Sequence, residues 1–267
     1  MKLKDRVALI TGASRGIGTA IAKRMAREGA AVVVNYFRSE KAALQVVKDI
    51  ENSGGRAIAI RADVGDYQQV KNMMEQATGE LGKVDILVSN AGIGGLRKPI
   101  IDTTPEEFFE MITNHLIGAY NCAHNVLPYM RQYERGDIQF ISSRNAEFCG
   151  PETGAYNAAK GGIDALAKSL AKEERYNGIR VNAIAPGMVE TDMTREGIAE
   201  VTGIQDMRRV DPGLPFGRLI QPEDIGNLCA FLASPEGSHI SGEVIYVRQA
   251  VGNEPPSFYL SGPRNYY

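Results

Sequence analysis

Short apolar segments alternate along this chain with stretches of helical periodicity, most of which are about ten to fifteen residues long. The expected strands cover residues 6–10, 31–35, 57–61, 85–88, 139–141, 180–184 and 244–247. Helices are expected at residues 19–29, 40–53, 67–81, 104–133 and 156–176. Strands that are joined through helices run parallel and are covered on both faces. The pattern therefore predicts a single α/β domain, a doubly wound parallel sheet of about seven strands with helices on both faces.

A glycine-rich turn, TGASRGIG at residues 11–18, joins the first expected strand to the first expected helix. Gly12 permits the tight turn, Gly16 lets backbone amides approach a phosphate, and Gly18 allows close packing of the helix. The N-terminus of that helix attracts negative charge. The turn therefore predicts a site for the pyrophosphate of a dinucleotide.

The end of the second expected strand indicates which dinucleotide is bound. An acidic residue there would accept hydrogen bonds from the ribose hydroxyls of NAD. The chain instead offers Tyr36, Arg38 and Ser39, and Arg15 lies in the glycine-rich turn. Two guanidinium groups and a hydroxyl suit a 2′-phosphate, so NADP(H) is the predicted cofactor and NAD(H) the alternative. Asp63, after the third strand, is expected to hold the adenine edge.

Tyr156 and Lys160 are four residues apart, which places them on one face of a helix. A lysine ammonium beside a phenol favours the phenolate and lowers the tyrosine pKa. Such a tyrosine exchanges a proton with an alcohol or carbonyl oxygen. Ser142 and Ser143, at the end of the preceding strand, are expected near that same oxygen. The group predicts a proton-transfer site.

Five ordered motifs together resemble the short-chain dehydrogenase/reductase family, and within it the 3-oxoacyl-acyl-carrier-protein reductases. They are TGASRGIG, SNAG at residues 89–92, the serine pair, Tyr156-x-x-x-Lys160 and RVNAIAPGMVETDM at residues 180–193. The resemblance implies a Rossmann-fold domain over residues 1–248, with a substrate lid at about 193–216 and a C-terminal tail at 249–267. It also implies hydride transfer between nicotinamide C4 and a substrate carbon.

The resemblance implies a role for each matching residue. Tyr156 would exchange the proton, Lys160 would bind the nicotinamide ribose and lower the tyrosine pKa, and Ser143 would orient the substrate carbonyl. The backbone of Pro186 and Gly187 would contact the nicotinamide. Besides the residues already given, those implied to bind the cofactor are Ser14, Ile17, Val64, Asn90, Ala91, Gly92, Val189 and Thr191, the last at the carboxamide.

The family's fourth catalytic residue, an asparagine, has two candidates in this chain. Counting back from Gly118 and Ser143 places His115 at that position, with Asn114 one residue earlier. If Asn114 serves, the helix must carry an extra residue, as a π-bulge supplies. If His115 serves, it would hold the water that links Lys160 to solvent and would titrate near neutral pH. A third interpretation is that neither residue matters and catalysis is impaired.

Charge and composition argue against several classes of function. The net charge is −2 without a basic cluster, which indicates neither nucleic acid nor a membrane surface as partner. The N-terminus enters a strand without a signal peptide, and no apolar run is long enough to span a bilayer, so a cytoplasmic protein is expected. The three histidines, His115, His124 and His239, lack ligand spacing, so no metal site is predicted.

The sequence therefore predicts an NADP(H)-dependent reductase of a carbonyl to a secondary alcohol, or the reverse, with 3-oxoacyl thioesters among the candidate substrates. The alternatives are an NAD-preferring secondary alcohol or sugar dehydrogenase, and a nucleotide-binding scaffold or sensor without turnover. The resemblance implies a homodimer or homotetramer. It also implies docking arginines for a carrier-linked substrate, but Glu134 and Asn177 occupy those places, with Arg131, Arg135 and Arg175 close by.

Overall fold

The computed structural model describes residues 1–133, 135–192, 194–196, 199, 206–209, 214 and 216–248. Within these ranges seven strands form one sheet in the order β3-β2-β1-β4-β5-β6-β7, and every pair is parallel. The strands are β1 (Val7–Ile10), β2 (Ala31–Tyr36), β3 (Arg56–Arg61), β4 (Ile86–Ser89), β5 (Gly136–Ile141), β6 (Ile179–Pro186) and β7 (Val244–Val247). The predicted doubly wound sheet is confirmed.

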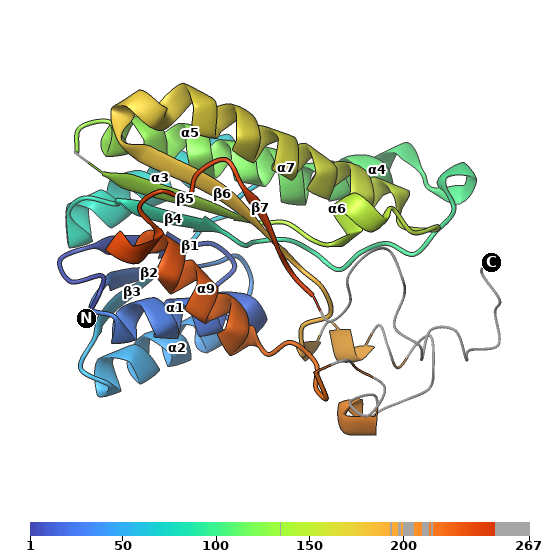
Figure 1. The fold of residues 1–267 in the computed structure, drawn as a ribbon, viewed down its shortest axis with the longest axis horizontal. Coiled ribbons are helices and arrows are strands. Elements are labelled where there is room, and N and C mark those ends of the chain that lie inside the picture. The colour runs from blue at the N-terminus through green and yellow to red at the C-terminus, as the bar shows by residue number, and fades with distance from the viewer. Residues whose placement is uncertain are drawn as a thin grey trace.

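Helices cover both faces of this sheet (Figure 1). One face carries α1 (Gly16–Arg27), α2 (Glu40–Asn52) and α9 (Pro222–Ala233). The other carries α3 (Tyr67–Leu81), α5 (Gly118–Met130) and α7 (Gly154–Glu174), with α4 (Pro105–Ile112) against α7. The short segments are α6 (Asn145–Phe148) and the 3₁₀ turns Ile100–Asp102, Arg175–Asn177, Met207–Arg209 and Pro235–Gly237.

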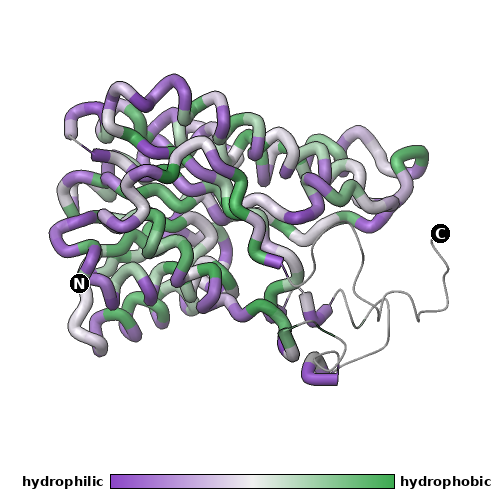
Figure 2. The backbone as a smooth tube through the Cα atoms, viewed as in Figure 1, coloured by the Kyte–Doolittle hydropathy of each residue, from purple (hydrophilic) through white to green (hydrophobic). Residues whose placement is uncertain are grey.

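The strands are predominantly apolar, as expected for a parallel sheet that is buried on both faces. In β1, Val7 and Leu9 belong to the hydrophobic cluster on one face, and Ala8 and Ile10 belong to the cluster on the other. Figure 2 shows the same distribution, with hydrophobic residues concentrated in the strands and hydrophilic residues along the outer helices. The two clusters pack the sheet between its helical layers.

The strand order reverses next to β1, which lies between β2 and β4. In open parallel sheets ligands bind at such a reversal, in the crevice outside the carboxyl ends of the strands. Gly12 follows β1 and Asn90 follows β4 at this point. The fold therefore positions the predicted dinucleotide site at its switch point.

The stretch expected as one helix over residues 104–133 is interrupted by a π-helical turn. α4 leads into this turn at Thr113–Ile117, and α5 follows it at Gly118. A π-turn adds one residue to the helix. The extra residue that was the condition for a role of Asn114 is therefore present.

Candidate active site

The glycine-rich turn packs directly against the loop that follows β4. Gly12 has a φ of 61°, and a Cβ placed on it would lie 2.9 Å from Ala91 Cα. A Cβ on Gly18 would lie 2.5 Å from the Gly12 carbonyl oxygen and 2.7 Å from Asn90 Nδ2. Both positions therefore exclude a side chain for steric reasons, and the first also favours glycine by its backbone conformation.

Three buried or half-buried polar side chains fasten this turn. Asn90 Nδ2 donates to the carbonyl oxygens of Thr11, at 2.9 Å, and Gly12, at 3.2 Å. The Thr11 hydroxyl accepts from the backbone amides of Asn90 and Ala91, each at 2.9 Å. Asn35 Oδ1 accepts from the Gly12 amide at 3.1 Å. Sequence reasoning did not assign these positioning roles to Thr11 and Asn35, whose signal is a polar residue at the end of an apolar strand.

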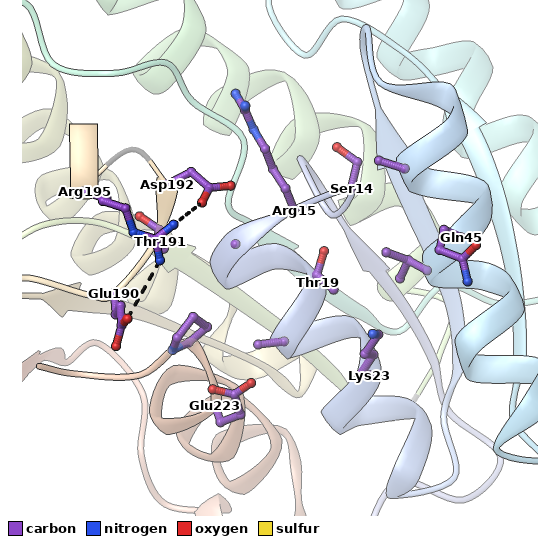
Figure 3. A pocket seen from close by; sticks show the side chains of 15 residues that line it. Ser14, Arg15, Thr19, Lys23, Gln45, Glu190, Thr191, Asp192, Arg195 and Glu223 are labelled. Atoms are coloured by element: carbon purple, nitrogen blue, oxygen red, sulfur yellow. Dashed lines mark hydrogen bonds and ion pairs between the residues drawn. The ribbon is translucent and has the colours of Figure 1, made fainter. Parts of the chain in front are cut away.

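A cavity of about 460 Å³ opens beside the N-terminus of α1 (Figure 3). Ser14, Arg15 and Gly16 line it from the turn, and Thr191 lines it from the segment after β6. Arg195 pairs there with Asp192 at 3.1 Å. Four of the residues predicted to bind the cofactor thus line this cavity, whereas Tyr156 and Lys160 do not.

The cations expected at the 2′-phosphate are exposed. Arg15 lies at the start of α1, and Arg38 follows β2, where its guanidinium lies 5.3 Å from the centroid of the Phe37 ring. Neither guanidinium pairs with a carboxylate of the residues described. Ser39 is the exposed residue before α2. Tyr36 is instead buried, and its hydroxyl donates to Glu40 at 3.1 Å.

The remaining residues predicted for the cofactor also lie after the carboxyl ends of strands. Asp63 Oδ1 accepts from the Gly65 amide at 2.9 Å, which fixes the turn after β3. The Gly187 amide donates to Val247 at 2.7 Å, and the Pro186 carbonyl accepts from Arg144 at 2.9 Å. The other residues predicted to bind the cofactor also lie at this edge of the sheet. They are Ile17 at the start of α1, the buried Val64, the exposed Gly92 and the buried Val189.

Ser143, Tyr156 and Lys160 come together beside this edge. The Ser143 hydroxyl contacts the Tyr156 hydroxyl. Lys160 Nζ lies 5.6 Å from the centroid of the Tyr156 ring and donates to the carbonyl oxygen of Ile141 at 2.8 Å. Lys160 is only 5% exposed. The arrangement provides a phenol with a hydroxyl donor on its oxygen and a buried cation beside its ring.

The predicted lowering of the Tyr156 pKa by Lys160 is wrong for this structure. Burial raises the pKa of Tyr156 above its ordinary value, and only the hydrogen bond from Ser143 opposes it. Burial likewise lowers the pKa of Lys160 to about 8, against the attraction of Asp164. Removal of the Tyr156 hydroxyl from water therefore changes the pKa of the tyrosine more than the neighbouring lysine cation does.

His115, rather than Asn114, lies against the tyrosine. The His115 ring meets the Tyr156 ring edge-on at 5.2 Å between centroids, and its Nε2 donates to the Ile93 carbonyl at 3.1 Å. The Asn114 amide donates to the Glu110 carbonyl of its own helix at 2.9 Å. A Cβ on Gly92 would collide with the His115 ring. The imidazole therefore fills the space under the loop after β4.

A family model described as enoyl-(acyl carrier protein) reductase matches residues 12–249. The 3-oxoacyl-[acyl-carrier-protein] reductase FabG of Staphylococcus aureus is 38% identical over 241 residues, which are 90% of this chain and 95% of that protein. The chain belongs to the short-chain dehydrogenase/reductase family. It is therefore an NAD(P)-dependent oxidoreductase of that family.

Two solved structures of short-chain dehydrogenases share the fold. A 7α-hydroxysteroid dehydrogenase complexed with NADH and 7-oxo glycochenodeoxycholic acid is 34% identical with a TM-score of 0.87, covering 95% of this chain and 96% of that one. A short-chain dehydrogenase from Burkholderia cenocepacia in complex with NADP is 31% identical with a TM-score of 0.82, covering 92% and 98%. One holds NADH and the other NADP, so membership of the family leaves the preference open.

The expectation that His115 titrates near neutral pH is wrong. Burial, followed by the charge of Lys160, lowers the pKa of His115 to about 3. The ring is therefore neutral from pH 5 upward. Because Nε2 donates to Ile93, Nδ1 carries no proton in the neutral ring, and it is a buried acceptor without a partner in the described part of the chain.

This lowered pKa predicts how stability depends on pH. The unfolded histidine binds a proton below about pH 6.5, whereas the folded one stays neutral, so stability falls as the pH drops from 6.5 toward 3. Between pH 7 and pH 5, wild type should lose about 2 kcal/mol more of its free energy of unfolding than His115→Gln does. Urea denaturation at the two pH values measures this difference. If wild type and His115→Gln lost the same free energy of unfolding, the lowered pKa of His115 would be contradicted. It would also be contradicted if the exposed His239→Gln differed from wild type as much as His115→Gln does.

Neither a metal centre nor a membrane span emerges from the described ranges. They contain no group of three or more His, Cys, Asp or Glu side chains that could hold a metal ion. None of the helices in those ranges is both long and apolar enough to cross a bilayer. Most of the predicted lid at 193–216, the whole tail at 249–267 and Glu134 lie outside the described residues.

Proposed function

We propose that the protein is an NADP(H)-dependent carbonyl reductase or secondary alcohol dehydrogenase that acts on a small molecule. The observation that carries the proposal is the Tyr156 hydroxyl, which contacts Ser143, with the buried Lys160 beside the tyrosine ring. Because burial raises its pKa, the phenol is protonated near neutral pH and serves as an acid. This supports the reductive direction.

The residues at the switch point fit a nicotinamide dinucleotide. The turn at Gly12 and Gly18 excludes side chains, and the N-terminus of α1 faces the cavity through Gly16. Helix N-termini bind phosphate through free amides and the helix dipole. Lys160 Nζ has three donors, one of which is used by Ile141, which leaves two for ribose hydroxyls. Lys160 thus holds the nicotinamide half beside Tyr156.

The chain's own groups then handle the substrate oxygen. When bound, the reduced nicotinamide supplies a hydride to the carbonyl carbon. The Ser143 hydroxyl donates a hydrogen bond to the carbonyl oxygen, and Tyr156 gives that oxygen its phenolic proton. The Lys160 ammonium stabilises the phenolate that remains. His115 packs against the tyrosine ring and restricts its rotation.

A screen of ketones and 3-oxoacyl thioesters, monitored by loss of NADPH absorbance, tests this function. Turnover of at least one carbonyl compound is expected. Tight binding of NADPH without turnover of any compound would favour the alternative of a nucleotide-binding scaffold or sensor. Turnover with NADH at a lower KM than with NADPH would favour the NAD-preferring dehydrogenase.

The cofactor preference is expected to depend on the two exposed arginines. Charge-assisted hydrogen bonds to a phosphate contribute about 1.5–3 kcal/mol each, so Arg15→Ala and Arg38→Ala should each raise the KM for NADPH about 10–100-fold. The KM for NADH, which lacks the phosphate, should hardly change. Steady-state kinetics with both cofactors measure this, with Lys48→Ala, an exposed cation further along α2, as control. Equal effects on NADH and NADPH would contradict a 2′-phosphate role.

Intrachain contacts of nearby arginines favour a small-molecule substrate over a carrier-linked one. Arg131 pairs with the buried Glu174, which also accepts from Asn177 at 2.8 Å. Arg135 donates to the carbonyl oxygens of Ala233 and Ser234, at 2.7 and 2.8 Å. These guanidinium groups are therefore committed within the chain. The substrate screen described above also tests carrier-linked substrates.

Exposed apolar side chains support the predicted homodimer or homotetramer. Phe109 of α4 is 66% exposed, Ile117 at the end of the π-helical turn is 39% exposed, and Tyr120 in the first turn of α5 is 45% exposed. Neighbouring apolar groups at a surface mark a contact site. Sedimentation velocity measures the assembly, and a dimer or tetramer is expected. A cytoplasmic location stays a prediction from the sequence.

A further inference from the structure

The face of α7 that carries Lys160 continues into a buried carboxyl group, Asp164, that none of the steps above uses. Asp164 lies one helical turn beyond Lys160, so the two side chains share a face. It is only 9% exposed, and the next residues along this buried face, Ala167 and Leu170, are apolar. A carboxyl group in such surroundings costs free energy unless it is paired. A cationic partner is therefore expected.

One oxygen of this carboxyl group is left for such a partner. The Ser142 hydroxyl contacts the Asp164 carboxyl group and also donates, at a long 3.4 Å, to the Lys160 carbonyl oxygen. Asp164 Oδ1 is buried and accepts no hydrogen bond from the residues that the structure describes. The Lys160 ammonium, in turn, is held only by the neutral carbonyl of Ile141 within the same ranges. Among the residues that the structure describes, neither group therefore has a direct ion-pair partner.

Charged and titratable groups from the surrounding elements also act on this pair. On α7, Lys168 lies one turn beyond Asp164 and attracts it. From β7, Tyr246 is close enough for the charge of Asp164 to act on it: burial, Glu147 and Asp164 raise the pKa of its hydroxyl, and Arg248 lowers it. These two neighbours are a cation and a neutral phenol.

On the other side of Lys160, Tyr156 and His115 are both neutral near pH 7, because burial raises the pKa of the phenol and lowers that of the imidazole. Burial raises the pKa of Asp164, while Ser142, Lys168 and Lys160 oppose it. Burial also lowers the pKa of Lys160 to about 8, and Asp164 is the one group that raises it. Asp164 is therefore the carboxyl group that acts on the buried lysine from one helical turn away, without a direct ion pair between them.

We propose that Asp164 is a positioning residue that keeps the buried Lys160 in its ammonium form and thereby sets the upper pH limit of proton transfer at Tyr156. The proposal rests on the proposed function. A neutral lysine amine cannot stabilise the phenolate left after Tyr156 donates its proton. Without Asp164, the ammonium would lose its proton at a lower pH, and activity would decline from that pH upward.

NMR of the lysine side chains tests the electrostatic part without cofactor or substrate. The protein is labelled with ¹³C-lysine, and the Lys160 signal is assigned by its loss in Lys160→Met. In wild type this signal should titrate near pH 8. In Asp164→Asn, which keeps the shape and removes the charge, it should titrate at lower pH. Glu173→Gln removes an exposed carboxylate from the same helix and should leave the titration unchanged.

The outcomes are separable. An unchanged Lys160 titration in Asp164→Asn overturns the proposal. Should that variant fail to fold, Asp164→Ser removes the same charge with a smaller side chain and carries the same test. Asp164→Glu should restore a titration close to that of wild type, which a purely steric role of Asp164 would not produce.

The kinetic readout is the alkaline limb of kcat/KM for a carbonyl substrate. In Asp164→Asn this limb should move to lower pH, and above the limb the ratio of wild-type to variant activity grows about tenfold for each pH unit of the movement. Below it the two enzymes should be alike. A shifted titration without turnover would defeat the proposed function alone, whereas turnover with an unshifted titration would defeat the role of Asp164 alone.

Discussion

Replacing Tyr156 with phenylalanine should lower kcat about 10²–10⁴-fold, the usual contribution of a positioned general acid. Phenylalanine keeps the ring that packs against His115 and loses only the hydroxyl that Ser143 contacts. The affinity for NADPH should therefore change little. Stopped-flow absorbance of NADPH measures kcat, and fluorescence titration measures the affinity.

The matched control is Tyr120→Phe, which removes a hydroxyl from a tyrosine on α5 that is 45% exposed. It should leave kcat unchanged. Retained turnover in Tyr156→Phe would remove the proposed proton donor. A parallel loss of NADPH affinity would show instead that the hydroxyl serves binding rather than chemistry.

The sheet and its glycine-rich turn were predictable because their signals are local. Continuous apolar runs of a few residues identify strands that are buried on both faces, and Gly12 and Gly18 mark the turn that follows the first. Strand ends differ from the prediction by few residues, as in β6, which extends through Pro186. The motifs at those ends then follow from the parallel arrangement.

α9 was not predicted, although its N-terminus carries a signal. Pro222 occupies the first turn, and Gln221 and Asp224 form reciprocal hydrogen bonds with the backbone. The helix packs against α1, and its buried residues include Gly226 and Cys229. Gly226 approaches the backbone of α1 closely, which is a tertiary reason for a glycine inside a helix. Periodicity alone does not reveal such a contact.

The electrostatics of the site could not be predicted from the sequence, because burial decides them. Spacing placed Tyr156 and Lys160 on one face of α7, but the sign of the tyrosine shift depends on how far the hydroxyl is removed from water. For the same reason His115 is neutral rather than poised near pH 7. Asp164 gave no signal, since nothing in the spacing shows that its face of α7 is buried.

The largest loss of stability is expected when Asp137 is replaced, at the end of the sheet opposite the active site. Asp137 is the second residue of β5, is 2% exposed and pairs with Arg6 at 2.8 Å, Arg180 at 2.5 Å and Arg135 at 3.4 Å. Asp85, which binds Arg6 at 2.6 Å, is the other acid of this network. Asp137→Ala leaves the partly buried guanidinium groups of Arg180 and Arg135 without a counter-charge and leaves Arg6 with Asp85 alone, so the free energy of unfolding should fall by about 3–5 kcal/mol.

Urea denaturation at fixed protein concentration measures that loss, and Asp49→Ala, which breaks a half-exposed surface pair with Lys23, is the control with a small effect. The folded fraction of Asp137→Ala should keep the wild-type KM for NADPH, because β5 reaches the site only at its other end, before Ser143. Tyr156→Phe should show the reverse, full stability without turnover. A loss below about 1 kcal/mol in Asp137→Ala would mean that the three guanidinium groups reach solvent or other acceptors, and that the network does not hold β1, β4 and β5 in register.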